Sequence, residues 1–230
     1  EAVRLSKKHL IPVFLRLTTH VCHAKEDISF SGIKPQTGNK LPVFSPVNGP
    51  YLPITKSVFP LKRKALQRLA EVEKESENSP FNTVHAPFGL ENIDGKIYGI
   101  ISSSMPVLSI LENLDKAKKP VDLLQINFSY PLPKEIVTKF LNSHDEIVII
   151  EELDRIMESE IKALAFDRNI KCKIHSRKDD EDLMSELGTE RTWKILSGTW
   201  GEIFPSEIEK ADLPFNNPRV PQMCPGCGHR

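Results

Sequence analysis

Two cysteines near the end of the sequence have the spacing of metal ligands. Cys224 and Cys227 flank Pro225-Gly226, and His229 follows two residues later. Proline pre-sets the first central position of a turn and glycine supplies the positive φ of a type II turn, so both thiols would point to one side. Zinc or an iron–sulfur cluster normally takes four ligands. The pair therefore indicates an incomplete metal site, with an incidental turn and a disulfide as the alternatives.

A second polar cluster follows an apolar run near the start of the sequence. Residues 11–15 read Ile-Pro-Val-Phe-Leu, which predicts a buried strand, and residues 18–23 read Thr-Thr-His-Val-Cys-His. The carboxyl ends of strands present groups to ligands in α/β sheets. The alternative is that the hydroxyls cap a turn and the histidines are solvated. Nucleophilic catalysis by Cys22 and His23 is disfavoured, because adjacent side chains rarely face each other and no orienting group can be named.

Two further polar groups follow predicted strands. Ser102-Ser103-Ser104 precedes a helix that starts near Pro106, where hydroxyls and N–H groups could hold a phosphate or carboxylate. Phosphate loops usually contain glycine, which is absent there, so helix N-capping is the favoured interpretation. Glu151 and Glu152 end another strand, where they could act as acid and base or bind a hard cation. Consecutive residues point apart, so a structural role at the start of the next helix is favoured.

The composition excludes several classes of protein. Of the 230 residues, 31 are Lys or Arg and 31 are Asp or Glu, so no net positive charge attracts nucleic acid or an anionic membrane. No apolar run approaches the roughly 20 residues that cross a bilayer, and the first residues lack a signal-peptide pattern. Four cysteines are too few for a disulfide scaffold. We expect a cytoplasmic protein with reduced thiols and with neither nucleic acid nor membrane as a partner.

The first part of the sequence predicts a partial domain followed by a linker. Residues 1–10 have helical character and lead into the strand of residues 11–15, which has no neighbouring strands unless other sequence supplies them. We therefore expect the chain to be a piece of a larger protein. Repeated prolines between residues 35 and 60 exclude regular helix and favour an extended connection. One amphipathic helix is then predicted from apolar residues at helical spacing, which are Leu61, Ala65, Leu69 and Val72.

From Lys96 onward, short apolar runs alternate with amphipathic stretches. The runs predict strands at residues 97–101, 121–127, 147–150 and 170–174, and the stretches between them predict three helices. This β-α-β-α-β-α-β order with short connections is typical of a parallel sheet with helices on both faces. The predicted fold class is therefore α/β. Short additional helices are expected at residues 179–186, on the surface, and at residues 205–208.

Three segments together resemble one family. They are residues 12–23 (PVFLRLTTHVCH), residues 128–133 (FSYPLP) with 149–154 (IIEELD), and residues 224–230 (CPGCGHR). In order and spacing they resemble the alpha subunit of indolepyruvate ferredoxin oxidoreductase, a thiamine-dependent 2-oxoacid:ferredoxin oxidoreductase. The likeness extends over nearly the whole chain and is weakest from residue 177 to residue 199.

The resemblance implies a chemistry and a domain order. The family oxidatively decarboxylates aryl 2-oxoacids to acyl-CoA with thiamine diphosphate and Mg²⁺, and passes electrons through 4Fe-4S clusters to ferredoxin. Residues 1–34 would be the tail of the thiamine pyrimidine-binding domain, and residues 35–94 a linker with one helix. Residues 95–212 would form a transketolase C-terminal-like domain, and residues 213–230 a linker and the start of the diphosphate-binding domain. Implied partners are a beta subunit, ferredoxin, coenzyme A and a 2-oxoacid, within an oligomer.

The resemblance also assigns candidate site residues. Thr19 and His20 would lie near the substrate, His229 near the thiamine, and Cys224 and Cys227 would be metal ligands. His20 stands where the family usually has arginine, so the fork that captures a substrate carboxylate is replaced by an imidazole. The family's Gly-Asp-Gly motif does not occur in this sequence. We therefore expect the fragment to be non-catalytic by itself, to bind no cofactor alone and to have a structural role.

Two alternatives remain beside this interpretation. The first is a free-standing α/β module that binds a metal through Cys224, Cys227 and His229 in an oligomer. The second is a diverged relative that keeps the architecture for assembly without enzymatic activity.

Overall fold

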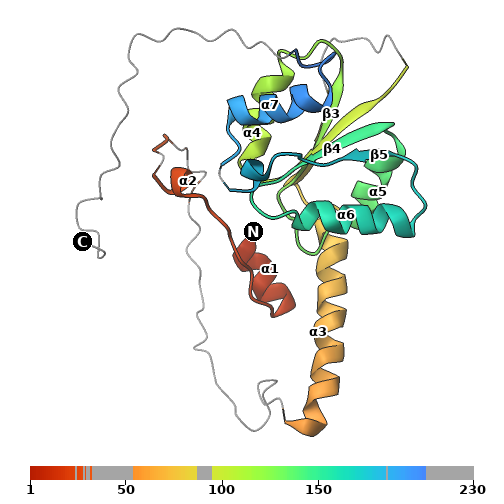
Figure 1. The fold of residues 1–230 in the computed structure, drawn as a ribbon. Helices are drawn as coiled ribbons and strands as arrows, with labels where there is room; N and C mark the ends of the chain where they lie inside the picture. Colours follow the sequence, from red (N-terminus) through yellow and green to blue (C-terminus); the bar gives the residue numbers. More distant parts are fainter. Residues whose placement is uncertain are drawn as a thin grey trace.

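The structure is a computed structural model that describes residues 1–23, 25–27, 29, 32, 54–86, 95–184 and 186–205. Its centre is a five-stranded sheet with strand order β1-β3-β2-β4-β5 (Figure 1). The strands are β1 (Asn82–His85), β2 (Tyr98–Ser102), β3 (Val121–Ile126), β4 (Glu146–Ile150) and β5 (Lys173–His175). Strand β1 runs antiparallel to β3, and the other neighbouring pairs are parallel. The sheet is therefore mixed but mostly parallel.

Helices cover both faces of this sheet. Helices α4 (Pro106–Leu114) and α7 (Thr189–Thr199) pack on one face, and α5 (Lys134–Asn142) and α6 (Ile156–Asp167) pack on the other (Figure 1). Successive strand residues point to opposite faces, so Ile100 belongs to the first core and Ile101 to the second. The α/β prediction is confirmed, and the fold is consistent with a transketolase C-terminal-like domain.

Besides a short helix at Thr19–His23, the structure adds two elements that the sequence did not predict. The first is β1, a polar strand whose only aliphatic residue, Val84, is exposed, so it carries no buried-strand pattern. The second is α7, whose sequence contains three threonines and Gly198, all weak helix formers. Burial of Trp193 and Leu196 against the sheet stabilises this helix. Tertiary packing thus outweighs local propensity in both cases.

The strand predicted at residues 11–15 is wrong. Residues 11–18 have no regular secondary structure, and Phe14 is 91% exposed. Isolated strands are not stable without a neighbour, and no described strand runs beside this segment. The flanking helices are α1 (Ala2–His9) and the short α2 (Thr19–His23).

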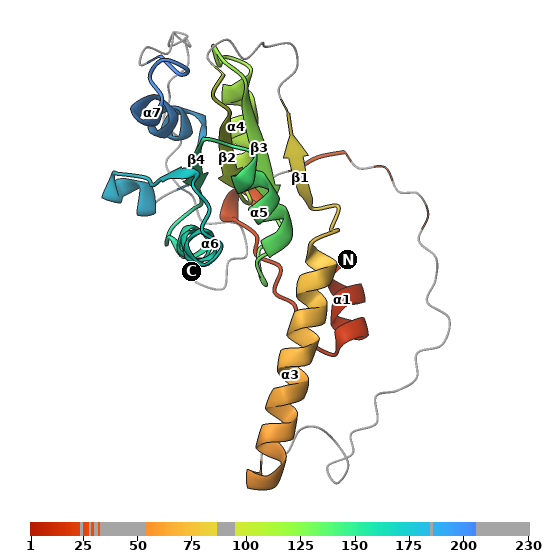
Figure 2. The same cartoon turned by 90° about the vertical axis from the view of Figure 1, so that its right-hand side faces the viewer.

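The linker helix is longer than predicted. Helix α3 (Thr55–Ser76) begins six residues before Leu61 and contains Pro60, so the extended conformation expected up to Pro60 is wrong from Thr55 onward. Figures 1 and 2 show α3 projecting away from the sheet, with α1 beside its C-terminal half. Proline lacks an N–H, so the helix loses one internal hydrogen bond at that position.

Smaller expectations are partly met. The surface helix expected at residues 179–186 is a shorter 3-10 helix, η1 (Asp180–Leu183), which the Asp179 carboxylate caps by accepting the Glu181 N–H at 3.1 Å. Strand β5 begins at Lys173, three residues later than expected. The helix expected at residues 205–208 lies mostly outside the described residues. The four domain boundaries given above stay predictions.

Candidate functional site

The first predicted site residues lie on helix α2. Thr19 and His20 form its first turn, and the Cys22 N–H donates to the Thr18 carbonyl at 3.1 Å. The Thr18 hydroxyl oxygen also accepts the Val21 N–H at 3.4 Å, so a threonine does cap this turn. Cys22 and His23 are exposed. The substrate-proximal roles of Thr19 and His20 stay predictions.

The structure does not describe the predicted metal ligands. Cys224, Cys227 and His229 fall outside the described residues. In the part of the chain that the structure does describe, no group of three or more His, Cys, Asp or Glu side chains could hold a metal ion. The described residues therefore supply no ligand set that fits a cluster or the Mg²⁺ of thiamine diphosphate, and no reaction step is assigned to them.

The serine turn after β2 does not cap a helix. The N-cap position of α4 is Met105, and no side chain hydrogen-bonds there, so the capping prediction is wrong. Ser102 is buried and donates its hydroxyl to the Ile150 carbonyl at 2.7 Å. Ser104 adopts a left-handed φ of 64°, and its N–H donates to the Asn127 side chain at 2.9 Å. These contacts tie the ends of β2, β3 and β4 together.

Glu151 caps the helix that follows its strand. Its carboxylate accepts the N–H groups of Met157 at 2.9 Å and Glu158 at 2.8 Å, in the first turn of α6. Those N–H groups have no partner within the helix, and the positive helix end favours a carboxylate. Burial raises the pKa of Glu151, and the two backbone hydrogen bonds oppose that rise. The structural role predicted for this pair of glutamates is confirmed for Glu151.

Further charged side chains are buried beside Glu151. Arg177 is 2% exposed and donates to the backbone carbonyls of Asp182 at 2.7 Å and Leu153 at 3.0 Å. Glu158 accepts from Lys162 and Ser176, both at 2.6 Å. Burial lowers the pKa of Arg177, and the nearby carboxylates of Glu151 and Glu158 oppose that fall. We call Glu151, Glu152, Arg155, Glu158 and Arg177 the carboxyl-edge cluster, because it lies beyond the carboxyl end of β4.

The carboxyl-edge cluster is incompletely paired. Among the described residues, the buried side-chain atoms without a hydrogen-bond partner are Glu152 Oε1, Arg155 Nε, Glu158 Oε2 and Arg177 Nε. An unpaired buried polar atom costs about 1–3 kcal/mol, so such an atom usually indicates strain, a functional role, or a bound water or ion. Both donors and acceptors are present, which suits bound water better than a metal.

One contact connects this cluster to the segment before α2. Glu152 Oε2 lies 3.8 Å from Arg16 Nη2, and the Glu152 side chain is only 4% exposed. Arg16 precedes Thr19 by three residues. The pair therefore brings the segment that carries Thr19 and His20 to the carboxyl edge of the sheet, which is the edge where α/β folds bind ligands.

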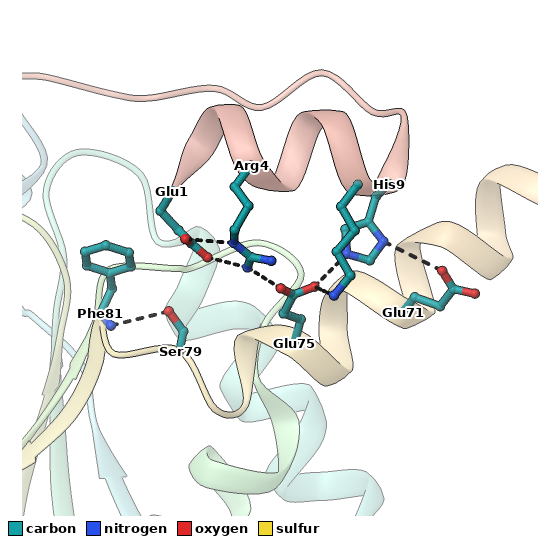
Figure 3. A network of polar contacts seen from close by, with 8 residues as sticks. Glu1, Arg4, His9, Glu71, Glu75, Ser79 and Phe81 are labelled. Atoms are coloured by element: carbon teal, nitrogen blue, oxygen red, sulfur yellow. Dashed lines mark hydrogen bonds and ion pairs between the residues drawn. The ribbon is translucent and has the colours of Figure 1, made fainter. Parts of the chain in front are cut away.

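A second charged network joins α1 to α3 (Figure 3). The Glu75 carboxylate of α3 contacts Arg4, the Lys8 amine at 2.8 Å and His9 Nε2 at 2.6 Å. The other nitrogen of the buried His9 ring lies 3.6 Å from Glu71 Oε2. Hydrogen bonds from Lys8, His9 and Arg4 lower the pKa of Glu75 to about 2. This network fixes α1 against the C-terminal part of α3, where Glu71 and Glu75 lie.

A surface hollow of about 550 Å³ lies beside this network. Its charged walls come from both helices, and Phe128 closes one side. Arg4, Lys8 and His9 all direct their polar atoms at Glu75, so the hollow is the margin of a helix contact and supplies no catalytic group. The sequence did not reveal this network because the residues of α1 lie 62 to 71 positions from their partners on α3.

The fold and the site define the chain as an α/β protein whose charged groups make contacts between its elements. A scan against protein-family models finds no match. Among curated proteins, the chain is 26% identical over 238 aligned positions to the indolepyruvate oxidoreductase subunit IorA of Methanothermobacter marburgensis, covering all of this chain and 36% of that protein. It is 27% identical to IorA of Pyrococcus abyssi, with the same coverage. For IorA of Archaeoglobus fulgidus, the identity is 25% and the coverage is 98% of this chain and 35% of that protein.

These comparisons confirm the resemblance found in the sequence. Over its whole length, the chain is similar to part of the indolepyruvate oxidoreductase subunit IorA. It spans a little over one third of the length of these relatives. None of the described helices is long and apolar enough to cross a membrane.

Proposed function

We propose that this chain is part of an indolepyruvate-type 2-oxoacid:ferredoxin oxidoreductase. The observation that carries the proposal is the similarity to IorA over the whole chain. The parent protein would oxidatively decarboxylate an aryl 2-oxoacid to acyl-CoA with thiamine diphosphate, Mg²⁺ and 4Fe-4S clusters. Its partners would be a beta subunit and ferredoxin, and a cytoplasmic location stays a prediction from the cysteine content.

Within that enzyme, we infer that the chain has a structural role. Glu151 orders the loop between β4 and α6, and Glu152 holds Arg16 and with it the segment of Thr19 and His20. The domain would thus brace the substrate side of the site, while the chemistry is carried out by groups outside the described residues.

The test uses the complete parent protein, produced together with its partner subunit. In the presence of coenzyme A, the enzyme should transfer electrons from indolepyruvate to a viologen dye. Removal of thiamine diphosphate and Mg²⁺ should abolish this dye reduction. The 230-residue chain alone should give no turnover. A parent protein that binds no thiamine diphosphate would overturn the proposal.

Two readouts separate the rival accounts. Stoichiometric zinc or iron in the purified 230-residue chain, lost on Cys224→Ser, would favour a metal-binding module. An inactive parent that gains arylpyruvate turnover on His20→Arg would favour a diverged relative, because arginine restores the fork for a carboxylate.

A further inference from the structure

Helix α3 has two halves of opposite charge. Its first 16 residues, 55–70, contain five cationic residues and no acidic one: Lys56, Lys62, Arg63, Lys64 and Arg68. The segment 71–77 contains four glutamates and one lysine: Glu71, Glu73, Glu75, Glu77 and Lys74. This order opposes the helix dipole, which favours acidic residues at the N-terminus and basic ones at the C-terminus.

The acidic half is already covered by groups of opposite charge. Arg4, Lys8 and His9 of α1 contact Glu75 (Figure 3). Lys134 Nζ lies 3.0 Å from Glu73. Val72 in this half is only 2% exposed. The helix therefore binds its neighbours by combining a buried apolar stripe with complementary charge.

The basic half has the same two components. Arg68 at its end donates to the Leu10 carbonyl at 3.2 Å, but the earlier turns include a face that the described residues leave exposed. Phe59 is 77% exposed and Leu66 is 54% exposed, and Lys62 and Arg63 are exposed between them. Residues at i, i+3, i+4 and i+7 share one side of a helix, so these four form a single surface. We call Phe59, Lys62, Arg63 and Leu66 the Phe59 face. Figures 1 and 2 show this half of α3 extending away from the sheet domain.

Local energetics also indicate a missing partner. Lys56 in the first turn of α3 is unfavourable to the dipole, and Pro60 removes one hydrogen bond of the helix. In proteins, most helical stability comes from tertiary packing of an apolar face. A partner that buries Phe59 and Leu66 and supplies carboxylates would offset both deficits.

We propose that the Phe59 face is a docking surface for an acidic amphipathic helix of a partner protein. Phe59 and Leu66 would enter the apolar stripe of that helix, and Lys62 and Arg63 would pair with its carboxylates. The charges of α3 indicate the kind of partner. Basic groups bind its acidic half, so we expect acidic groups to bind its basic half. The inference rests on α3 alone and is independent of the proposed oxidoreductase function.

The test uses two fluorescent peptides of the same 16-residue length and leucine spacing, one with glutamate and one with lysine at every polar position. The complete 230-residue chain should bind the acidic peptide at least tenfold tighter than the basic one, and the binding should weaken with salt. Lys62→Glu/Arg63→Glu should lower the affinity for the acidic peptide at least tenfold. Lysine, arginine and glutamate have similar helix propensities, so a loss of binding does not come from a weaker helix.

Matched controls decide the outcome. Lys116→Glu/Lys118→Glu reverses the same amount of charge at exposed positions after α4 and should leave the affinity unchanged. Phe59→Ala should weaken binding, whereas Phe166→Ala, at an 84% exposed phenylalanine of α6, should not. Equal binding of both peptides, or no binding of either, would overturn the proposal. So would tighter binding of single-stranded RNA or anionic vesicles than of the acidic peptide, or a wild-type dimer that Lys62→Glu/Arg63→Glu dissociates.

Discussion

The Glu151 carboxylate accepts the backbone N–H of Met157 at 2.9 Å, so the acid that ends β4 caps the helix that follows. A capping residue usually lies at the helix boundary itself, whereas Glu151 lies before the connecting loop and its carboxylate contacts the first turn of the helix beyond that loop. The interaction therefore fixes the loop as well as the helix end. Because the loop includes Glu152, it also fixes the contact with Arg16.

We expect Glu151→Ala to destabilise the protein by about 1–3 kcal/mol, because two N–H groups in a buried position lose their acceptor. Urea unfolding followed by circular dichroism measures this change. Glu160→Ala, at an exposed position of the same helix, should change stability by less than about 0.5 kcal/mol. Equal effects of the two substitutions would show that the cap contributes nothing.

The contact between α1 and α3 should depend on pH. The pKa of Glu75 is lowered to about 2 from its ordinary value of 4.5, so its stabilising contribution is present above pH 4.5 and lost as pH falls towards 2. Hydrogen exchange of the α1 amides should therefore accelerate over that interval, and high salt should accelerate it too. Glu75→Gln should give fast exchange already at pH 6. Exchange in the wild type that is independent of pH, after correction for the intrinsic rate, would contradict this account.

Two glycines should respond in opposite ways to alanine. A Cβ on Gly99 would lie 2.8 Å from side-chain atoms of both Phe140 and His144, whose rings are 4.0 Å apart, so Gly99→Ala should cost about 1–3 kcal/mol. Gly198 is exposed within α7 and a Cβ there meets nothing within 4 Å. Gly198→Ala should stabilise by about 0.5–1 kcal/mol through helix propensity. Thermal unfolding of both variants checks the two signs, and a stabilising Gly99→Ala would refute the packing described for β2 and α5.

The two described cysteines should differ in reactivity. Burial, with smaller effects of Asp145 and Glu146, raises the pKa of the Cys172 thiol to about 11, whereas Cys22 is exposed. Because the thiolate is the reactive form, iodoacetamide at pH 8 should label Cys22 at least tenfold faster than Cys172. Mass spectrometry of the two tryptic peptides measures each rate separately. Comparable rates in the folded protein, with equal labelling in urea as the reference, would contradict the burial of Cys172.

Much of the sheet domain could be predicted from the sequence. The run from Ile147 to Ile150 and the helical spacing of Met157, Ile161 and Leu164 identify β4 and α6, because such periodicity is a local property. The edge strand β1 has no such pattern, since its stability comes from hydrogen bonds to β3. The apolar run at residues 11–15 has the pattern but lacks a strand to pair with, so the same rule failed there.

The candidate site divides in the same way. The sequence identified Glu151 and Glu152 at a strand end and favoured a structural role for them. It could not identify Arg177 as a buried neighbour of Glu151, because Arg177 comes from a segment with no apolar periodicity. The residues proposed from the family resemblance, Thr19, His20, Cys224, Cys227 and His229, remain predictions that need the parent protein.

By itself, the sequence determined the α/β class, the order of the main strands and helices, and the relationship to IorA, because these follow from local periodicity and from motifs in fixed order. Only the tertiary structure decided the strand order β1-β3-β2-β4-β5, the cap that Glu151 places on α6 and the ion pairs that Glu75 forms with α1. Those features depend on contacts between residues that lie far apart in the chain or across an irregular loop. Their free energy is set by burial and geometry, which no local pattern of residues contains.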